Sequence, residues 1–77
     1  MPDYLKKIKE TISEKSGVSK REIKIDSFFE EDLNLGELEL IDIFTDLEDI
    51  LHVDLLDKRE ELETVQDLVD LLIEKLD

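Results

Sequence analysis

The sequence predicts an all-α fold, a small bundle of three main helices and one short helix in a single domain of residues 1–77. Apolar residues recur at the three- and four-residue spacing of amphipathic helices in three segments. Candidate capping residues stand at the ends of these segments. The chain has no cysteine, so disulfides and thiolate metal sites are excluded and helix packing must hold the fold together.

The first predicted helix runs from Asp3 to about Ser16. Its apolar positions follow helical spacing, at Leu5, Ile8 and Ile12. Asp3 can cap the first turn, and Gly17 can adopt the left-handed conformation that ends many helices.

Residues 19–32 show no clear period, and we interpret them as a long loop with a turn of helix around Lys20 to Ile23. A loop of this length in a compact domain needs side chains of its own that pack. We expect Ile23, Phe28 and Leu33 to fix it to the core.

The strongest helical pattern lies between Leu33 and Leu51, with Gly36 or Asn34 as the candidate N-cap. The residues expected to face the core are Leu40, Phe44, Leu47 and Leu51, with Ile43 and Ile50 widening the stripe. The acidic residues of the polar side are Glu37, Glu39, Asp42, Asp46, Glu48 and Asp49. We expect the other helices to pack against this one.

A short helical turn is predicted at Asp57 to Glu61, within a mostly polar stretch anchored by apolar residues at Val53, Leu55, Leu56 and Leu62. The last helix follows Thr64, whose hydroxyl can cap it together with Asp67, a relative of the capping box. Its apolar positions are Val65, Leu68, Val69, Leu72, Ile73 and Leu76.

The formal net charge is -13 and the sequence pI is about 4.3, which argues against a nucleic-acid-binding protein and predicts basic partners. Seven of the ten Lys and Arg residues lie at or before Lys24, and residues 26–57 contain none. An acidic helix face can simply be solvated, but its concentration in one segment favours a docking surface. The residues expected to contact partners are Glu37, Leu38, Glu39, Asp42, Ile43, Asp46 and Glu48.

The chain resembles acyl carrier proteins over nearly its whole length. The resemblance is carried by Gly17-Val18, Ser27-Phe28, Glu31-Asp32-Leu33, the helical segment LELIDIFTDLEDIL, and the stretch from Leu62 to Leu68. It implies a bundle of three long helices and one short helix. It also implies that the partners are enzymes of acyl transfer, which would bind this chain through basic surfaces of their own.

The family's defining motif is Asp-Ser-Leu at the start of the second helix, where the serine carries 4'-phosphopantetheine through a phosphodiester. Alignment on Asp32-Leu33 places Gly36-Glu37-Leu38 on this motif. A carboxylate cannot form the phosphodiester, so we expect no covalent arm and no cofactor. Glu37 would then be an acid that suits the positive end of the helix dipole, or a mimic of the charge of the phosphodiester.

Two alternatives stay open from the sequence. The chain could be a working carrier of fatty-acid or polyketide-type synthesis, with its arm on Ser27 of Asp26-Ser27-Phe28 or on a serine that was replaced at position 37. Ser27 is otherwise a loop serine that makes a local turn or cap. The second alternative is an acidic regulator that imitates a polyanion and blocks a nucleic-acid-binding site.

Nothing in the sequence indicates catalysis, because no nucleophile and base pattern and no glycine-rich phosphate loop is present. The acidic residues do not match the calcium-loop spacing, and His52 has no second histidine or cysteine, so we expect no metal site. No apolar run suits a membrane span or export signal. We therefore expect a cytoplasmic, monomeric protein that is not an enzyme.

Overall fold

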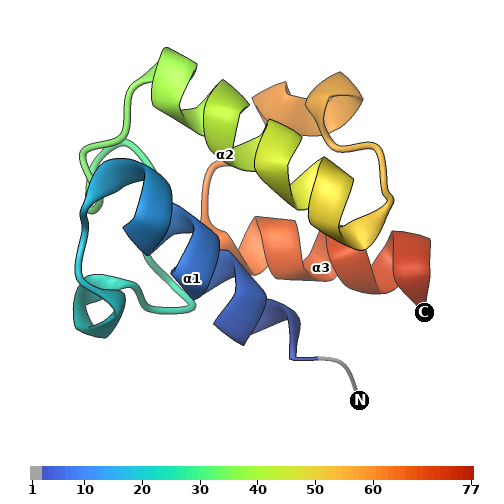
Figure 1. Cartoon of the computed structure of the whole chain (residues 1–77), viewed down its shortest axis with the longest axis horizontal. Coiled ribbons are helices and arrows are strands. Elements are labelled where there is room, and N and C mark those ends of the chain that lie inside the picture. Colours follow the sequence, from blue (N-terminus) through green and yellow to red (C-terminus); the bar gives the residue numbers. More distant parts are fainter. Residues whose placement is uncertain (1–2) are drawn as a thin grey trace.

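The computed structural model describes residues 3–77 and confirms an all-α fold (Figure 1). The helical segments, in chain order, are α1 (Tyr4–Ser16), η1 (Lys20–Glu22), α2 (Glu37–Leu51), η2 (Leu56–Glu61) and α3 (Val65–Leu76). The two η segments are short 3₁₀ helices. Between residues 3 and 77 there is no strand, and the sheet-like pairing is limited to a single antiparallel bridge between Phe28 and Thr64.

Helix α1 begins and ends as the sequence predicts. The Asp3 carboxylate accepts a hydrogen bond from the N–H of Lys6 (2.9 Å), which satisfies one of the free donors of the first turn. Gly17 has a φ of 81°, and its N–H donates to the carbonyl of Ser13 (2.9 Å). This left-handed conformation is one that glycine adopts at little cost.

The loop between η1 and α2 is held against the segment that precedes α3. The N–H of Phe29 donates to the carbonyl of Glu63 (2.9 Å), and the N–H of Val65 donates to the carbonyl of Ser27 (3.0 Å). Neighbouring residues in an extended pairing point to opposite sides. Phe29 is therefore in the core, and Phe28 is 40% exposed.

The expectation that Phe28 fixes the loop to the core was thus wrong, and Phe29 does so instead. Ile23 and Leu33 are buried as predicted, and Leu35 joins them. Asn34, between these two leucines, has a φ of 55°, a left-handed conformation that asparagine tolerates better than most residues.

Helix α2 begins after Gly36, one of the two predicted caps, and buries a stripe centred on Ile43, Phe44 and Leu47. Leu40 and Leu51, which were expected in the core, are only half-buried. Ile50 is exposed and does not widen the stripe as predicted. The buried face is therefore rotated toward Ile43 relative to the predicted one.

The C-terminal part of the chain follows the prediction closely. η2 includes the predicted turn and begins one residue earlier, at Leu56. The Thr64 hydroxyl accepts from the N–H of Asp67 (3.1 Å), and the Asp67 carboxylate accepts from the N–H of Thr64 (3.1 Å), which completes a capping box. The buried residues of α3 are Val65, Leu68 and Leu72, whereas Ile73 and Leu76 at its end are exposed.

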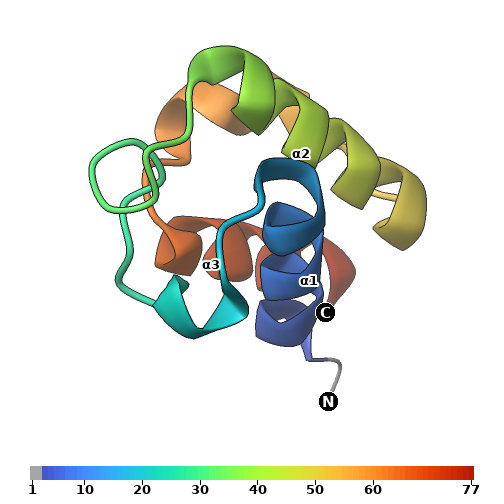
Figure 2. The same ribbon diagram turned by 60° about the vertical axis from the view of Figure 1, so that its left-hand side comes forward.

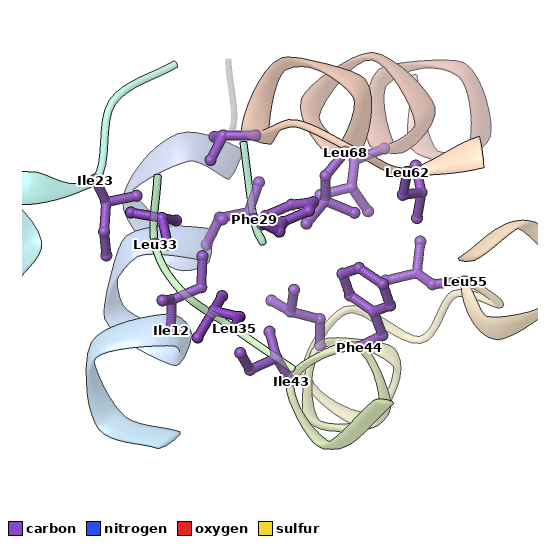
Figure 3. Close-up of a cluster of buried hydrophobic side chains, with 14 of the residues drawn as sticks. Ile12, Ile23, Phe29, Leu33, Leu35, Ile43, Phe44, Leu55, Leu62 and Leu68 are labelled. Carbon is purple, nitrogen blue, oxygen red and sulfur yellow. The ribbon is translucent and has the colours of Figure 1, made fainter. Parts of the chain in front are cut away.

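The core lies where α1, α2, α3 and the two loop segments converge (Figure 3). At its centre the rings of Phe29 and Phe44 meet edge to face, with centroids 5.8 Å apart and an interplanar angle of 74°. α1 packs against both α2 and α3. The Tyr4 hydroxyl donates to the carboxylate of Asp77 (3.0 Å), so the start of α1 lies beside the end of α3 (Figure 2). None of the helices formed by residues 3–77 has the length and apolar character needed to cross a membrane.

Candidate functional site

Glu37 is the first residue of α2, directly after the N-cap Gly36. The backbone N–H of Gly36 donates to Oε1 of Glu39 (3.2 Å). Glycine has no side chain with which to cap the helix in return, so only one half of a capping box is formed. The start of α2 therefore holds two carboxylates, of which Glu39 is bound to the backbone and Glu37 points to solvent.

The Glu37 carboxylate faces a cation on the neighbouring short helix. Its Oε1 lies 3.8 Å from Nη2 of Arg59 in η2, and the two side chains are 74% and 42% exposed. Exposed ion pairs of this kind stabilise a fold by only about 0 to 1 kcal/mol. The pair thus links α2 to η2 weakly and leaves the Glu37 carboxylate accessible.

An open groove of about 480 Å³ lies beneath this ion pair. α2 contributes Leu40 and Phe44, the preceding loop contributes Phe28 and Phe29, and Leu62 comes from the segment after η2. The rim is charged and is formed by Glu30, Glu31, Glu37, Arg59, Glu60 and Glu63. The groove is therefore lined by apolar side chains together with five glutamates and one arginine.

The serines of the chain do not suit a covalent group at the start of α2. All four serines precede Phe28 in the sequence, so α2 and the nine residues before it contain no serine. Ser27 is 5% exposed, and its Oγ accepts from the N–H of Lys24 (3.0 Å). Its hydroxyl is part of a local turn rather than a helix start. The residues present at α2 do not fit attachment of 4'-phosphopantetheine.

The exposed face of α2 has an apolar residue at one end and carboxylates along its length. Leu38 is 82% exposed, far more than any other large apolar side chain between residues 3 and 77. Asp42 lies one turn further on, with Oδ2 3.8 Å from Nζ of Lys15 in α1. Glu39 and the half-buried Asp46 lie on one side of the line that runs along the helix from Leu38 to Asp42.

Two of the residues expected to contact partners have other roles. Ile43 has no exposed surface, so it belongs to the core and cannot contact a partner on the folded protein; that expectation was wrong. The Glu48 carboxylate accepts hydrogen bonds from the N–H groups of Leu55 and Leu56, at 2.6 Å and 3.0 Å. It stabilises the turn into η2, which restricts its use in docking.

Two residues of this region were not among the expected partner contacts. Asp49 is exposed and continues the line of Leu38 and Asp42 at helical spacing. That spacing, opposite the buried stripe, could have identified it. Arg59 was also missed, although it and Lys58 are the first cations after the long acidic stretch.

Neither His52 nor the acidic residues are grouped as metal ligands among residues 3–77. His52 is the C-cap of α2, with a φ of 55°, and its side chain is exposed. Within the described part of the chain, no three histidine or carboxylate side chains are grouped as metal ligands would be.

No protein-family profile matches the chain, but individual relatives do. An acyl carrier protein of Rubrobacter xylanophilus is 30% identical over 73 residues, which cover 94% of this chain and 90% of the relative. An acyl carrier protein of Petrotoga mobilis is 35% identical over 75 residues, covering 96% and 88% of the two chains. An acyl carrier protein of Exiguobacterium sibiricum is 38% identical over 63 residues, covering 80% of each chain.

Proposed function

Because this chain belongs to the acyl carrier protein family, we propose that it is a docking protein of that family that carries no covalent 4'-phosphopantetheine arm. The observation that carries the proposal is the first position of α2. Glu37 stands there, and alignment on Asp32-Leu33 would put Gly36-Glu37-Leu38 where the family has Asp-Ser-Leu. The family's prosthetic group is attached through a serine oxygen, and a carboxylate cannot form the same phosphodiester.

The environment of Glu37 supports a role that is electrostatic rather than covalent. Its carboxylate is exposed at the positive end of the α2 dipole, where a negative charge is stabilised by about 0.3 to 1 kcal/mol. The neighbouring Arg59 adds a weak attraction. A phosphodiester would bring negative charge to the same place, so Glu37 preserves the sign of the charge without the arm.

Docking is assigned to the exposed face of α2. We name as the docking face the residues Leu38, Glu39, Asp42, Asp46 and Asp49. Leu38 is the apolar contact, because a leucine with 82% exposure gains most from burial against a partner. The carboxylates attract basic surfaces and give binding a strong salt dependence. Partners are thus basic surfaces of enzymes of fatty acid synthesis or related acyl transfer.

The absence of the arm is tested by intact-mass measurement. The protein is incubated with coenzyme A and a broad-specificity phosphopantetheinyl transferase, beside an acyl carrier protein that has an Asp-Ser-Leu motif. We expect the control protein to gain the mass of the arm and this chain to stay unchanged. A mass gain on this chain would overturn the proposal, and peptide mapping would identify the serine.

Docking is tested separately by titration against an enzyme of fatty acid synthesis. Leu38→Ala is expected to weaken binding about tenfold, as loss of a central apolar contact does. Asp46→Lys with Asp49→Lys should weaken it further and flatten the salt dependence. The matched control is Glu74→Lys, at an exposed position of α3. Equal binding by all these variants would exclude α2 as the docking face.

A further inference from the structure

Apart from the acidic surface, the molecule has a compact region of positive charge at its N-terminal end. Residues 3–24 carry seven Lys and Arg against four Asp and Glu, whereas residues 25–77 carry three against nineteen. These cations lie on α1, on η1 and just after it. In Figure 1 this part of the chain occupies the lower left, away from η2 and the start of α2.

The cations of this region are mostly unpaired. Outside it, each of the three remaining cations forms an ion pair, Lys58 with Glu61, Arg59 with Glu37 and Lys75 with Asp57. Within it, Lys15 alone of the seven does so among the residues described, with Asp42. A chain with more than twice as many acids as bases offers abundant partners, so this lack of pairing leaves the positive charge available for another molecule.

Three of the unpaired lysines surround a small groove. Lys6 and Lys9 lie three residues apart on α1, a spacing that places their side chains on one face of the helix. Lys20, the first residue of η1, contributes to the same groove of about 250 Å³, together with the half-buried Leu5. Asp3 and Glu10 also line it. Asp3 is occupied as the cap of α1. We call Leu5, Lys6, Lys9 and Lys20 the basic patch.

We propose that the basic patch is a second docking surface, which binds an acidic face of a partner protein around one apolar side chain. The half-buried Leu5 beside the lysines supplies an apolar contact, and the three ammonium groups supply the positive charge. This arrangement has the opposite sign to the docking face on α2. The inference is independent of whether the chain carries an arm.

The size and charge of the molecule favour a protein over an extended polyanion. The molecule measures only 28 × 24 × 19 Å, and everything outside the N-terminal region is strongly acidic. A nucleic acid carries negative charge continuously along its axis, as an anionic membrane does across its surface. Both would extend past the basic patch and meet the acidic remainder. A limited acidic patch on a protein can match the lysines alone.

The test uses a defined acidic peptide as the probe. It is an N-acetylated helical peptide of about 14 residues with one leucine surrounded by glutamates, added to isotope-labelled protein. Titrations followed by NMR are made at about 150 mM salt, where the Debye length of about 8 Å screens repulsion from the acidic remainder. We expect saturable changes of amide shifts at Leu5, Lys6, Lys9 and Lys20.

Two triple variants with the same net charge distinguish an effect of the basic patch from an effect of the total charge of the protein. Lys6→Gln, Lys9→Gln and Lys20→Gln together should weaken binding of the peptide about tenfold or more. Lys58→Gln, Arg59→Gln and Lys75→Gln together form the control, with binding expected within about twofold of the parent protein. Far-UV circular dichroism verifies that both variants are folded.

Three results would overturn the proposal. They are a lack of saturable peptide binding, an equal loss of peptide affinity in the two triple variants, and amide shift changes that map outside the basic patch. Tighter binding of a short DNA duplex or of phosphatidylglycerol vesicles at the same lysines would also overturn it, because the patch would then recognise polyanions rather than an acidic protein face.

Discussion

The carboxylate of Glu48 accepts a hydrogen bond of 2.6 Å from the backbone N–H of Leu55, seven residues further along the chain. The same Oε2 atom accepts from the N–H of Leu56 at 3.0 Å. These bonds hold the end of α2 to the start of η2 across the left-handed residue His52. A residue that looks like one more acid on a charged helix therefore joins two elements of the fold.

Replacement of Glu48 is expected to destabilise the protein. Glu48→Ala should lower the free energy of unfolding by about 2 kcal/mol, because hydrogen bonds to a charged acceptor contribute about 1.5 to 3 kcal/mol. Glu48→Gln keeps one acceptor oxygen and should lose less. Urea unfolding followed by circular dichroism measures both. Asp49→Asn, at the exposed neighbouring position, is the control and should change stability by less than about 0.5 kcal/mol.

The adjacent phenylalanines of the long loop should respond very differently to truncation. Phe29→Ala removes a fully buried ring that contacts Phe44, and such losses cost about 3 to 5 kcal/mol. A domain of this size has roughly 5 to 15 kcal/mol of stability, so this loss is a large fraction of the total. Phe28→Ala, at a 40% exposed position, should cost much less. Equal urea midpoints for the two variants would contradict the assignment of Phe29 to the core.

These two cases show which features could be predicted from the sequence. The three α-helices follow from apolar periodicity and from local caps such as Asp3, Gly17 and Thr64, whose partners lie within four residues. Phe28 and Phe29 could not be told apart, because their orientation depends on pairing with residues 63–65, distant in sequence. The role of Glu48 depends on where the chain turns after α2. The alignment of Leu38, Asp42 and Asp49 along the exposed face of α2 was predictable from their spacing. The Glu37–Arg59 pair was not, because it depends on where η2 lies relative to α2.

Alkaline pH is expected to weaken the contact between Tyr4 at the start of α1 and Asp77 after α3. Burial, followed by the hydrogen bond to Asp77 and the charge of that carboxylate, raises the pKa of Tyr4 above its ordinary value of 10.0. The folded state thus favours the protonated phenol. This contribution to stability is complete below the unfolded-state pKa of about 10 and is lost as the pH rises through the higher folded-state pKa.

Two measurements test this expectation. Tyr4 is the single tyrosine and the chain has no tryptophan, so the ultraviolet absorbance of tyrosinate reports its titration directly. We expect a midpoint above 10 in the folded protein and near 10 in urea. Tyr4→Phe has no phenol to titrate, so its free energy of unfolding should decline less at alkaline pH. A midpoint at or below the value in urea would contradict the raised pKa.

Restoring the family motif at the start of α2 should restore the covalent acceptor. Gly36 has φ and ψ angles of -82° and 171°, which any residue can adopt, and a Cβ there would meet only Oε1 of Glu39 at 3.9 Å. Gly36→Asp with Glu37→Ser therefore rebuilds Asp-Ser-Leu without steric conflict. Aspartate is also a better N-cap than glycine by a few tenths of a kcal/mol, so the fold should not weaken.

In the transferase reaction this double variant is expected to gain the mass of one arm while the parent chain stays unmodified. Adding Ser27→Ala to the double variant should leave the gain intact, because the Ser27 hydroxyl is buried and accepts from the N–H of Lys24. If the gain disappeared with Ser27→Ala, the arm would be on Ser27. If the folded double variant were never modified, residue 37 alone would not explain the proposed lack of an arm. The acidic rim of the groove around Glu30, Glu31 and Glu60 would then be the next feature to test.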